Sequence, residues 1–147
     1  MQELSVTTFI EAPPAKVWDV MANRQGEWFC PSPWRCDVVE QDKRAGGVNK
    51  AVFRGPDGEE MPQEGLYLAW EEGRRFASTD AVTGDLEPAG PFMIGIWEIE
   101  PEGNGTRYTA RARHWREEDR KTHEEMGFIA GWEACAAQLK AVCEGEA

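Results

Sequence analysis

The order of elements expected in this chain of 147 residues is typical of an α+β protein. One strand and one helix come first, a run of short antiparallel strands follows, and a long helix ends the chain. Polar and apolar side chains alternate along the last strand, and apolar residues recur at helical spacing in the final helix. We therefore expect one curved antiparallel sheet that grips the C-terminal helix, in a single domain of residues 1–147.

The first elements follow from composition and from prolines. Residues 3–11 are rich in Thr, Val, Ile and Phe, which favours a strand. The proline pair after it suits the first turn of a helix, in which Val17, Val20 and Met21 recur at helical spacing. The aromatic segment 26–34, with its two prolines, predicts one further short helical turn.

Short strands then follow at close intervals, separated by glycine- and proline-rich turns. The segment 83–91 has two glycines and two prolines and predicts a loop. The expected strands are residues 35–42, 48–55, 60–73, 74–82, 92–100 and 106–115.

The last strand tells which of its side chains meet the core. Alternation places arginines on one face, which must meet water, and a set of small and aromatic residues on the other. The inner set is Tyr108, Ala110, Ala112 and His114. Two alanines in this set leave room for a helix or a ligand.

The long C-terminal helix is expected from about residue 116 to residue 144, with a weak point at Gly127 and Gly131. Its first part is polar all round. Its second part has an apolar stripe that should lie against the sheet: Ile129, Trp132, Ala136, Leu139 and Cys143.

Charge and composition exclude several classes of function. A net charge of −11 argues against nucleic acid and anionic membranes as partners, since both need basic residues. No apolar run approaches the ~20 residues of a membrane helix, and the N-terminus lacks the features of a secretion signal. We expect a cytoplasmic protein whose four cysteines are reduced and buried.

Four segments together resemble the activator of heat-shock-protein-90 ATPase-like family, within the START-like (SRPBCC, Bet v 1-like) helix-grip superfamily. They occur in the family's order and spacing, and the resemblance runs from about residue 3 to residue 143. The segments are "EAPPAKVWDVMAN" (11–23), "GEWFCPSPW" (26–34), "AGGVNKAVFRGPDGEEMPQEGLYL" (45–68) and "GFIAGWEACAAQL" (127–139).

The resemblance implies a helix-grip fold of about seven strands, with two short helices after the first strand. It also implies a cavity between sheet and helix that binds apolar molecules in many members. Some members are polyketide cyclases or dehydratases. The eukaryotic co-chaperone has a further N-terminal domain that this sequence does not contain, so we give chaperone contact little weight.

We expect the walls of such a cavity to be aromatic, with a few polar contacts. Asn49 stands where family members often have an aromatic residue, and it shares a strand face with Phe53. Trp28, Phe29 and Trp34 form either a lip of the cavity or a core plug. The expected ligand-binding residues are Trp28, Trp34, Asn49, Phe53, Tyr67, Trp97, His114, Met126 and Trp132.

Two residues are candidates for acid–base chemistry. His114 faces inward and histidine titrates near neutral pH, but we favour a structural role in which a hydrogen bond of His114 at the cavity end holds the helix. Glu64 would have a raised pKa if it faced the cavity, but alternation leaves its face undecided. His123 is expected to point outward from the polar helix start. No HExxH pattern is present, so we expect neither a metal nor a cofactor.

Three functions remain open on these grounds. The first is binding of a small hydrophobic molecule, either apolar or aromatic. The second is a cyclase- or dehydratase-like enzyme that uses a cavity His or Glu, and the third is a protein-interaction module. The oligomeric state is undetermined, and a dimer is compatible with the sequence.

Overall fold

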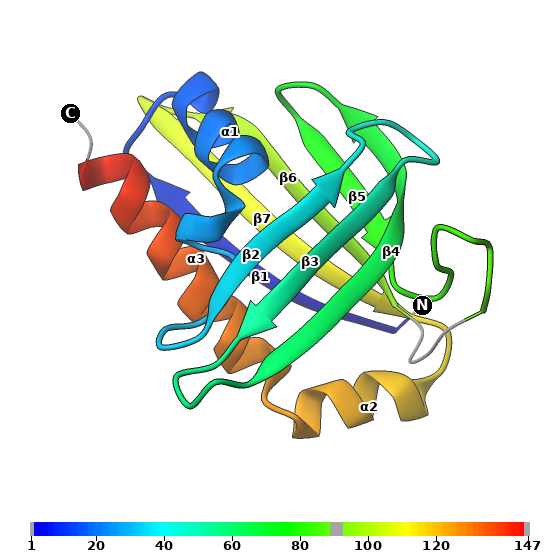
Figure 1. Ribbon diagram of the computed structural model, residues 1–147. Coiled ribbons are helices and arrows are strands. Elements are labelled where there is room, and N and C mark those ends of the chain that lie inside the picture. The colour runs from blue at the N-terminus through cyan, green and yellow to red at the C-terminus, as the bar shows by residue number, and fades with distance from the viewer. Residues whose placement is uncertain (1, 89–92, 146–147) are drawn as a thin grey trace.

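The computed structural model describes residues 2–88 and 93–145, and in it seven antiparallel strands form one curved sheet with a long helix along its concave side (Figure 1). The strand order is β1-β7-β6-β5-β4-β3-β2. The predicted α+β helix-grip architecture is therefore confirmed. The strands are β1 (Gln2–Ile10), β2 (Arg35–Gln41), β3 (Val48–Arg54), β4 (Glu60–Glu71), β5 (Arg75–Thr79), β6 (Ile94–Glu102) and β7 (Gly105–His114).

Two helical elements connect β1 to β2, and two more follow β7. They are α1 (Pro14–Asn23), the single 3-10 turn η1 (Gln25–Glu27), α2 (Glu117–Glu125) and α3 (Phe128–Gly145). In α1 the proline pair begins the helix, and Val17, Val20 and Met21 are buried as their spacing predicts.

The long C-terminal helix predicted from the sequence is broken in two. Gly127 has a φ of +83°, a left-handed conformation that ends α2 and that glycine adopts without steric cost. Gly131 lies inside α3 and breaks nothing. Of the two predicted weak points, only Gly127 changes the direction of the chain.

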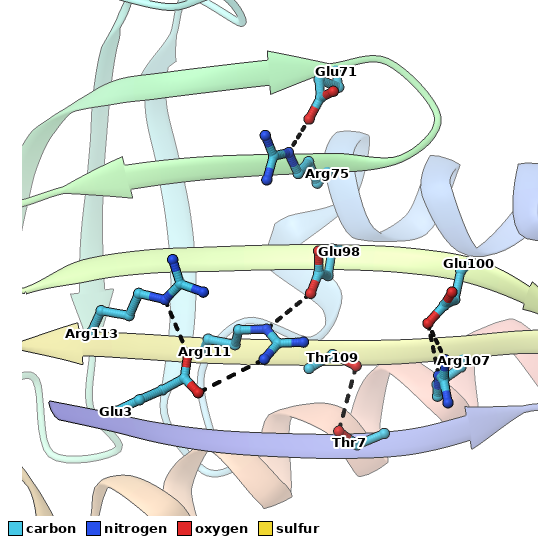
Figure 2. A network of polar contacts seen from close by, with 10 residues as sticks. All are labelled: Glu3, Thr7, Glu71, Arg75, Glu98, Glu100, Arg107, Thr109, Arg111 and Arg113. Carbon is cyan, nitrogen blue, oxygen red and sulfur yellow. Dashed lines mark hydrogen bonds and ion pairs between the residues drawn. The ribbon is translucent and has the colours of Figure 1, made fainter. Parts of the chain in front are cut away.

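The alternation predicted for the last strand is confirmed in β7. Tyr108, Ala110, Ala112 and His114 are all buried on the concave face. The arginines between them lie on the convex face, where Glu98 of β6 and Glu3 of β1 flank them (Figure 2). Strand β7 therefore separates a charged outer surface from the core.

Ion pairs across neighbouring strands neutralise this convex surface. Arg111 bonds Glu98 at 2.9 Å, Arg113 bonds Glu3 at 3.0 Å, and Arg107 pairs with Glu100 (Figure 2). Exposed pairs of this kind each contribute at most about 1 kcal/mol, so they add little to the stability of the fold.

Two further expectations concern loops and membranes. Residues 89–91 of the predicted loop and residue 92 of the predicted strand lie outside the described residues, while β6 begins at Ile94. Among the described residues, none of the helices has both the length and the apolar character that crossing a membrane would require. The four cysteines, which all lie within the described residues, form no disulfide bond and are buried.

Candidate ligand-binding site

Four aromatic rings from four parts of the chain meet between the sheet and α3, and we call them the aromatic cluster: Phe29, Phe53, Trp97 and Trp132. The ring of Phe29 lies 5.5 Å from that of Trp97 and 6.2 Å from that of Phe53, between centroids. Trp132 stacks on Trp97 at 5.5 Å. Three of the four rings are half-buried, whereas Trp97 is 6% exposed.

Each ring reaches the cluster from a different element. Phe29 follows η1, Phe53 lies on β3, Trp97 on β6 and Trp132 on α3. Because α3 packs mainly along β1, at one edge of the sheet, the stacking of Trp132 on Trp97 extends its contact toward the middle of the sheet.

The cluster is part of a longer row of stacked rings. Beyond Trp132 the row continues to Phe128 at 5.4 Å and then to His123 at 4.3 Å. Beyond Trp97 it continues to Phe76 at 5.3 Å and then to Trp70 at 5.1 Å. These rings therefore make contact across the space in which the family resemblance predicts a cavity.

Small residues on β6 and β7 make room for the Trp97 ring. Gly95 precedes Trp97 on the same face, and a Cβ at Gly95 would lie 2.4 Å from the Trp97 ring. Across the strands, Ala112 pairs with Gly95 and Ala110 pairs with Trp97. The Trp97 ring therefore uses part of the space beside Ala110 and Ala112, which was expected to hold a helix or a ligand.

Tyr67 is an inner-face residue with an unusual hydroxyl. Its side chain is 1% exposed, its ring contacts Trp70 and Phe76, and its hydroxyl makes no hydrogen bond among the described residues. Burial, and to a lesser extent the nearby Cys36 thiol, raise the pKa of Tyr67. Tyr67 therefore stays a neutral phenol at all ordinary pH values.

Asn49 shares the inner face with Phe53, as alternation predicts, but its amide already has a partner. Gln41 Nε2 donates to Asn49 Oδ1 at 3.2 Å and to Gln25 Oε1 at 2.9 Å. Gln25 is buried. This amide network joins η1, β2 and β3 at one end of the inner face.

Trp28 and Trp34 have different environments. Trp28 is 1% exposed and donates from Nε1 to the Val20 carbonyl at 3.1 Å, so it plugs the core beneath α1. Trp34 is half-buried in the segment before β2. The lip-or-plug question is therefore decided for Trp28 in favour of the plug.

His114 and His123 are in direct contact, although the sequence indicated nothing that would bring them together. Both side chains are buried, and His114 Nε2 lies 2.6 Å from His123 Nδ1. The prediction that His123 points outward is wrong, because α2 folds back against β1 and β7 and turns this one residue inward. Burial lowers the pKa of His123, and Asp119 opposes this shift.

Two other predicted residues lie away from the cluster. Glu64 lies on the convex face, where its carboxylate accepts a hydrogen bond from the Gly84 amide at 2.8 Å and lies 3.9 Å from Lys50 Nζ. It cannot act inside the sheet. Met126 is 69% exposed, because it caps α2 just before the turn at Gly127. Neither residue lines the interior.

Asp80 is a half-buried residue with one buried carboxylate oxygen, which sequence reasoning missed. It follows β5, its Oδ1 atom is buried without a hydrogen-bond partner among the described residues, and burial raises its pKa. His114 is close enough to oppose that shift. No group of three or more His, Cys, Asp or Glu side chains within residues 2–88 and 93–145 could hold a metal ion.

Two surface hollows lie outside the aromatic cluster. One, of about 600 Å³, lies between η1 and β2 and is lined by residues that include Gln25, Cys36 and Gln41. The other, of about 400 Å³, is lined by Phe9, Glu11 and Asn104. Neither includes a ring of the cluster.

The family model for Activator of Hsp90 ATPase homolog 1-like proteins matches residues 11–144. The chain belongs to this family. The fold of the Activator of Hsp90 ATPase homolog 1-like family is consistent with binding of small hydrophobic ligands between sheet and helix. No functionally curated protein matches the chain.

Solved structures agree with this assignment. A protein of Nitrosomonas europaea is 34% identical, with 99% of this chain and 96% of that chain covered and a TM-score of 0.88. A protein of Mycobacterium smegmatis is 26% identical, with 96% and 90% covered and a TM-score of 0.80. A protein of Silicibacter pomeroyi with the family's name is 18% identical, with 99% of both chains covered and a TM-score of 0.73, which supports the fold alone.

Proposed function

We propose that the protein binds a small apolar or aromatic molecule at the aromatic cluster. The observation that supports this most is the half-buried state of Phe29, Phe53 and Trp132 around the buried ring of Trp97. Apolar rings that keep contact with water gain free energy when a ligand covers them, at about 25 cal/mol for each Å² buried.

The geometry of the cluster favours a flat ligand. Trp132 stacks on Trp97 with an interplanar angle of 23°, whereas Phe29 is tilted by 46° to Trp97 and by 47° to Phe53. Such a ring set offers both a stacking surface and edges to an added aromatic ring. Charge is absent from the four side chains, so the ligand needs no counter-charge there.

The positions of the acid–base candidates make catalysis the weaker proposal. Glu64 lies on the convex face, and His114 is bonded to His123. These contacts direct neither side chain at the aromatic cluster.

Titration with 1-aminoanthracene, an uncharged aromatic fluorophore, tests the proposal. We expect saturable binding that Phe53→Ala weakens about tenfold, which corresponds to the loss of about 1.4 kcal/mol of ring contact. Phe53 is half-buried, so the variant should fold, which far-ultraviolet circular dichroism will check.

Leu68→Ala is the matched control, because Leu68 is an apolar strand residue that is 46% exposed and outside the cluster. It should bind the fluorophore as the unchanged protein does. Non-saturable binding, or equal weakening by both substitutions, would contradict the proposal. If the titration supports the proposal, native mass spectrometry of the protein from its own host can identify a co-purified ligand.

A further inference from the structure

We propose that the hydrogen bond between His114 and His123 is a pH-sensitive latch that holds α2 against the end of the sheet, where α2 covers one end of the row of stacked rings. This inference goes beyond the proposed function and does not depend on it. Its basis is the way in which α2 is attached to the rest of the fold.

Helix α2 is attached through one buried side chain. Of the nine residues from Glu117 to Glu125, only His123 is buried. Other charged side chains of α2, of which Asp119 and Arg120 are half-buried, pair with each other or with Arg116, as when Arg120 pairs with Glu117 and bonds Glu124 at 2.6 Å. Such pairs stabilise the helix itself but do not fasten it to the sheet.

His123 makes two contacts that leave the helix. One is the 2.6 Å bond between its Nδ1 atom and His114 Nε2 on β7, and the other is a nearly parallel stack on Phe128, at 4.3 Å and 5°. The left-handed turn at Gly127 separates α2 from α3, so α2 can move while α3 stays packed. The two contacts of His123 therefore decide whether α2 is docked.

The bond between the two imidazoles requires one N–H and one lone pair. When both rings are protonated, both facing nitrogens carry hydrogens and positive charge, so the bond becomes a repulsion. One proton added to the two neutral imidazoles is compatible with docking, because one facing nitrogen keeps its lone pair. A second added proton is not, because both facing nitrogens then carry hydrogens.

In the described part of the chain, two carboxylates from different segments lie near the pair. On α2, Asp119 lies one turn before His123 and pairs with Arg116 at 3.2 Å. After β5, Asp80 lies in electrostatic range of His114. Both carboxylates favour protonation of the pair, whereas burial opposes it and has the larger effect on His123.

In the described contacts, α3 and β1 place no charged side chain against the two histidines. Helix α3 contributes the uncharged ring of Phe128. Strand β1 directs Glu3 to the convex face, where it bonds Arg113 at 3.0 Å and lies 3.8 Å from Arg111.

Amide hydrogen exchange followed by mass spectrometry tests the latch without any ligand. After correction for the intrinsic effect of pH on exchange, protection of residues 117–125 should fall about tenfold between pH 7.5 and pH 5.5. Protection of β6 and β7 should not change. Loss of protection in these strands together with α2, or no loss in α2, would overturn the proposal.

His123→Phe is the decisive variant, because a phenyl ring can stack on Phe128 but cannot be protonated. Its α2 protection should differ less than about twofold between the two pH values. His114→Gln replaces it if the first variant does not fold, since an amide can bond His123 without adding a second titrating ring. Lys121→Ala, at an exposed position of α2, is the control and should keep the full pH effect. A pH effect of the same size in the histidine variants would disprove the latch.

Discussion

Trp132 of α3 lies nearly flat against Trp97 of β6, with ring centroids 5.5 Å apart and ring planes inclined by 23°. Because α3 packs mainly along β1, this stack joins the helix to the middle of the sheet. It also forms one side of the aromatic cluster. The contact is therefore expected to matter for both stability and binding.

Trp132→Ala should lower the free energy of unfolding by about 2 kcal/mol, below the range for fully buried tryptophans because Trp132 is half-buried. Urea unfolding followed by circular dichroism measures this loss. Val39→Ala, at a site that is 63% exposed, should change stability by less than about 0.5 kcal/mol. Equal losses in the two variants would mean that the stack does not anchor α3.

Gly95→Ala should destabilise the fold by about 1–3 kcal/mol, because the added methyl group would lie 2.4 Å from the Trp97 ring. The ring must then move, so binding of 1-aminoanthracene should weaken as well. Thermal unfolding and the fluorescence titration measure the two effects. A stable variant with unchanged binding would show that Trp97 has another position available.

The two glycines of the C-terminal helical region should respond in opposite directions to alanine. Gly131→Ala should stabilise by up to about 1 kcal/mol, since Gly131 lies within α3 and its new methyl would meet only Pro31, at 3.8 Å. Gly127→Ala should destabilise by about 1 kcal/mol, because its φ of +83° is strained for alanine. Urea midpoints of the two variants, measured side by side, check the signs.

Stability should fall as the pH falls below about 6.5, the pKa of an unperturbed histidine. The pKa of His123 is lowered in the folded protein, so in this range the unfolded chain binds more protons. The contribution of His123 is complete above the unfolded pKa and is lost as the pH falls through the folded one. Urea unfolding at several pH values measures the slope, which should be smaller in His123→Phe.

Periodicity predicted the parts of the fold in which one face meets water and the other meets the core. The sides of Tyr108 and His114 on β7 were correct because four arginine and threonine positions alternate with them. Gly127 and Gly131 were both expected as weak points of one long helix, because glycine has a low helix propensity, and only Gly127 became a break. Local sequence therefore indicated where the helix could break, but not which of the two glycines would break it.

The positions that could not be predicted depend on the register between strands and on the direction in which the chain turns after β7. The face of Glu64 required the pairing of β4 with β3, which places Lys50 opposite it. The inward position of His123 required the angle between α2 and β7, which no periodicity contains. Phe128 was missed, although its spacing of four residues before Trp132 was a usable signal.

The row of rings from Trp70 to His123 has an optical consequence. Aromatic chromophores stacked this closely couple their electronic transitions, so the row should give a strong near-ultraviolet circular dichroism signal that depends on the mutual angles of Trp70, Trp97 and Trp132. A ligand that separates or tilts any two of them would change that signal. The protein thus contains its own spectroscopic reporter at the place where we expect it to bind.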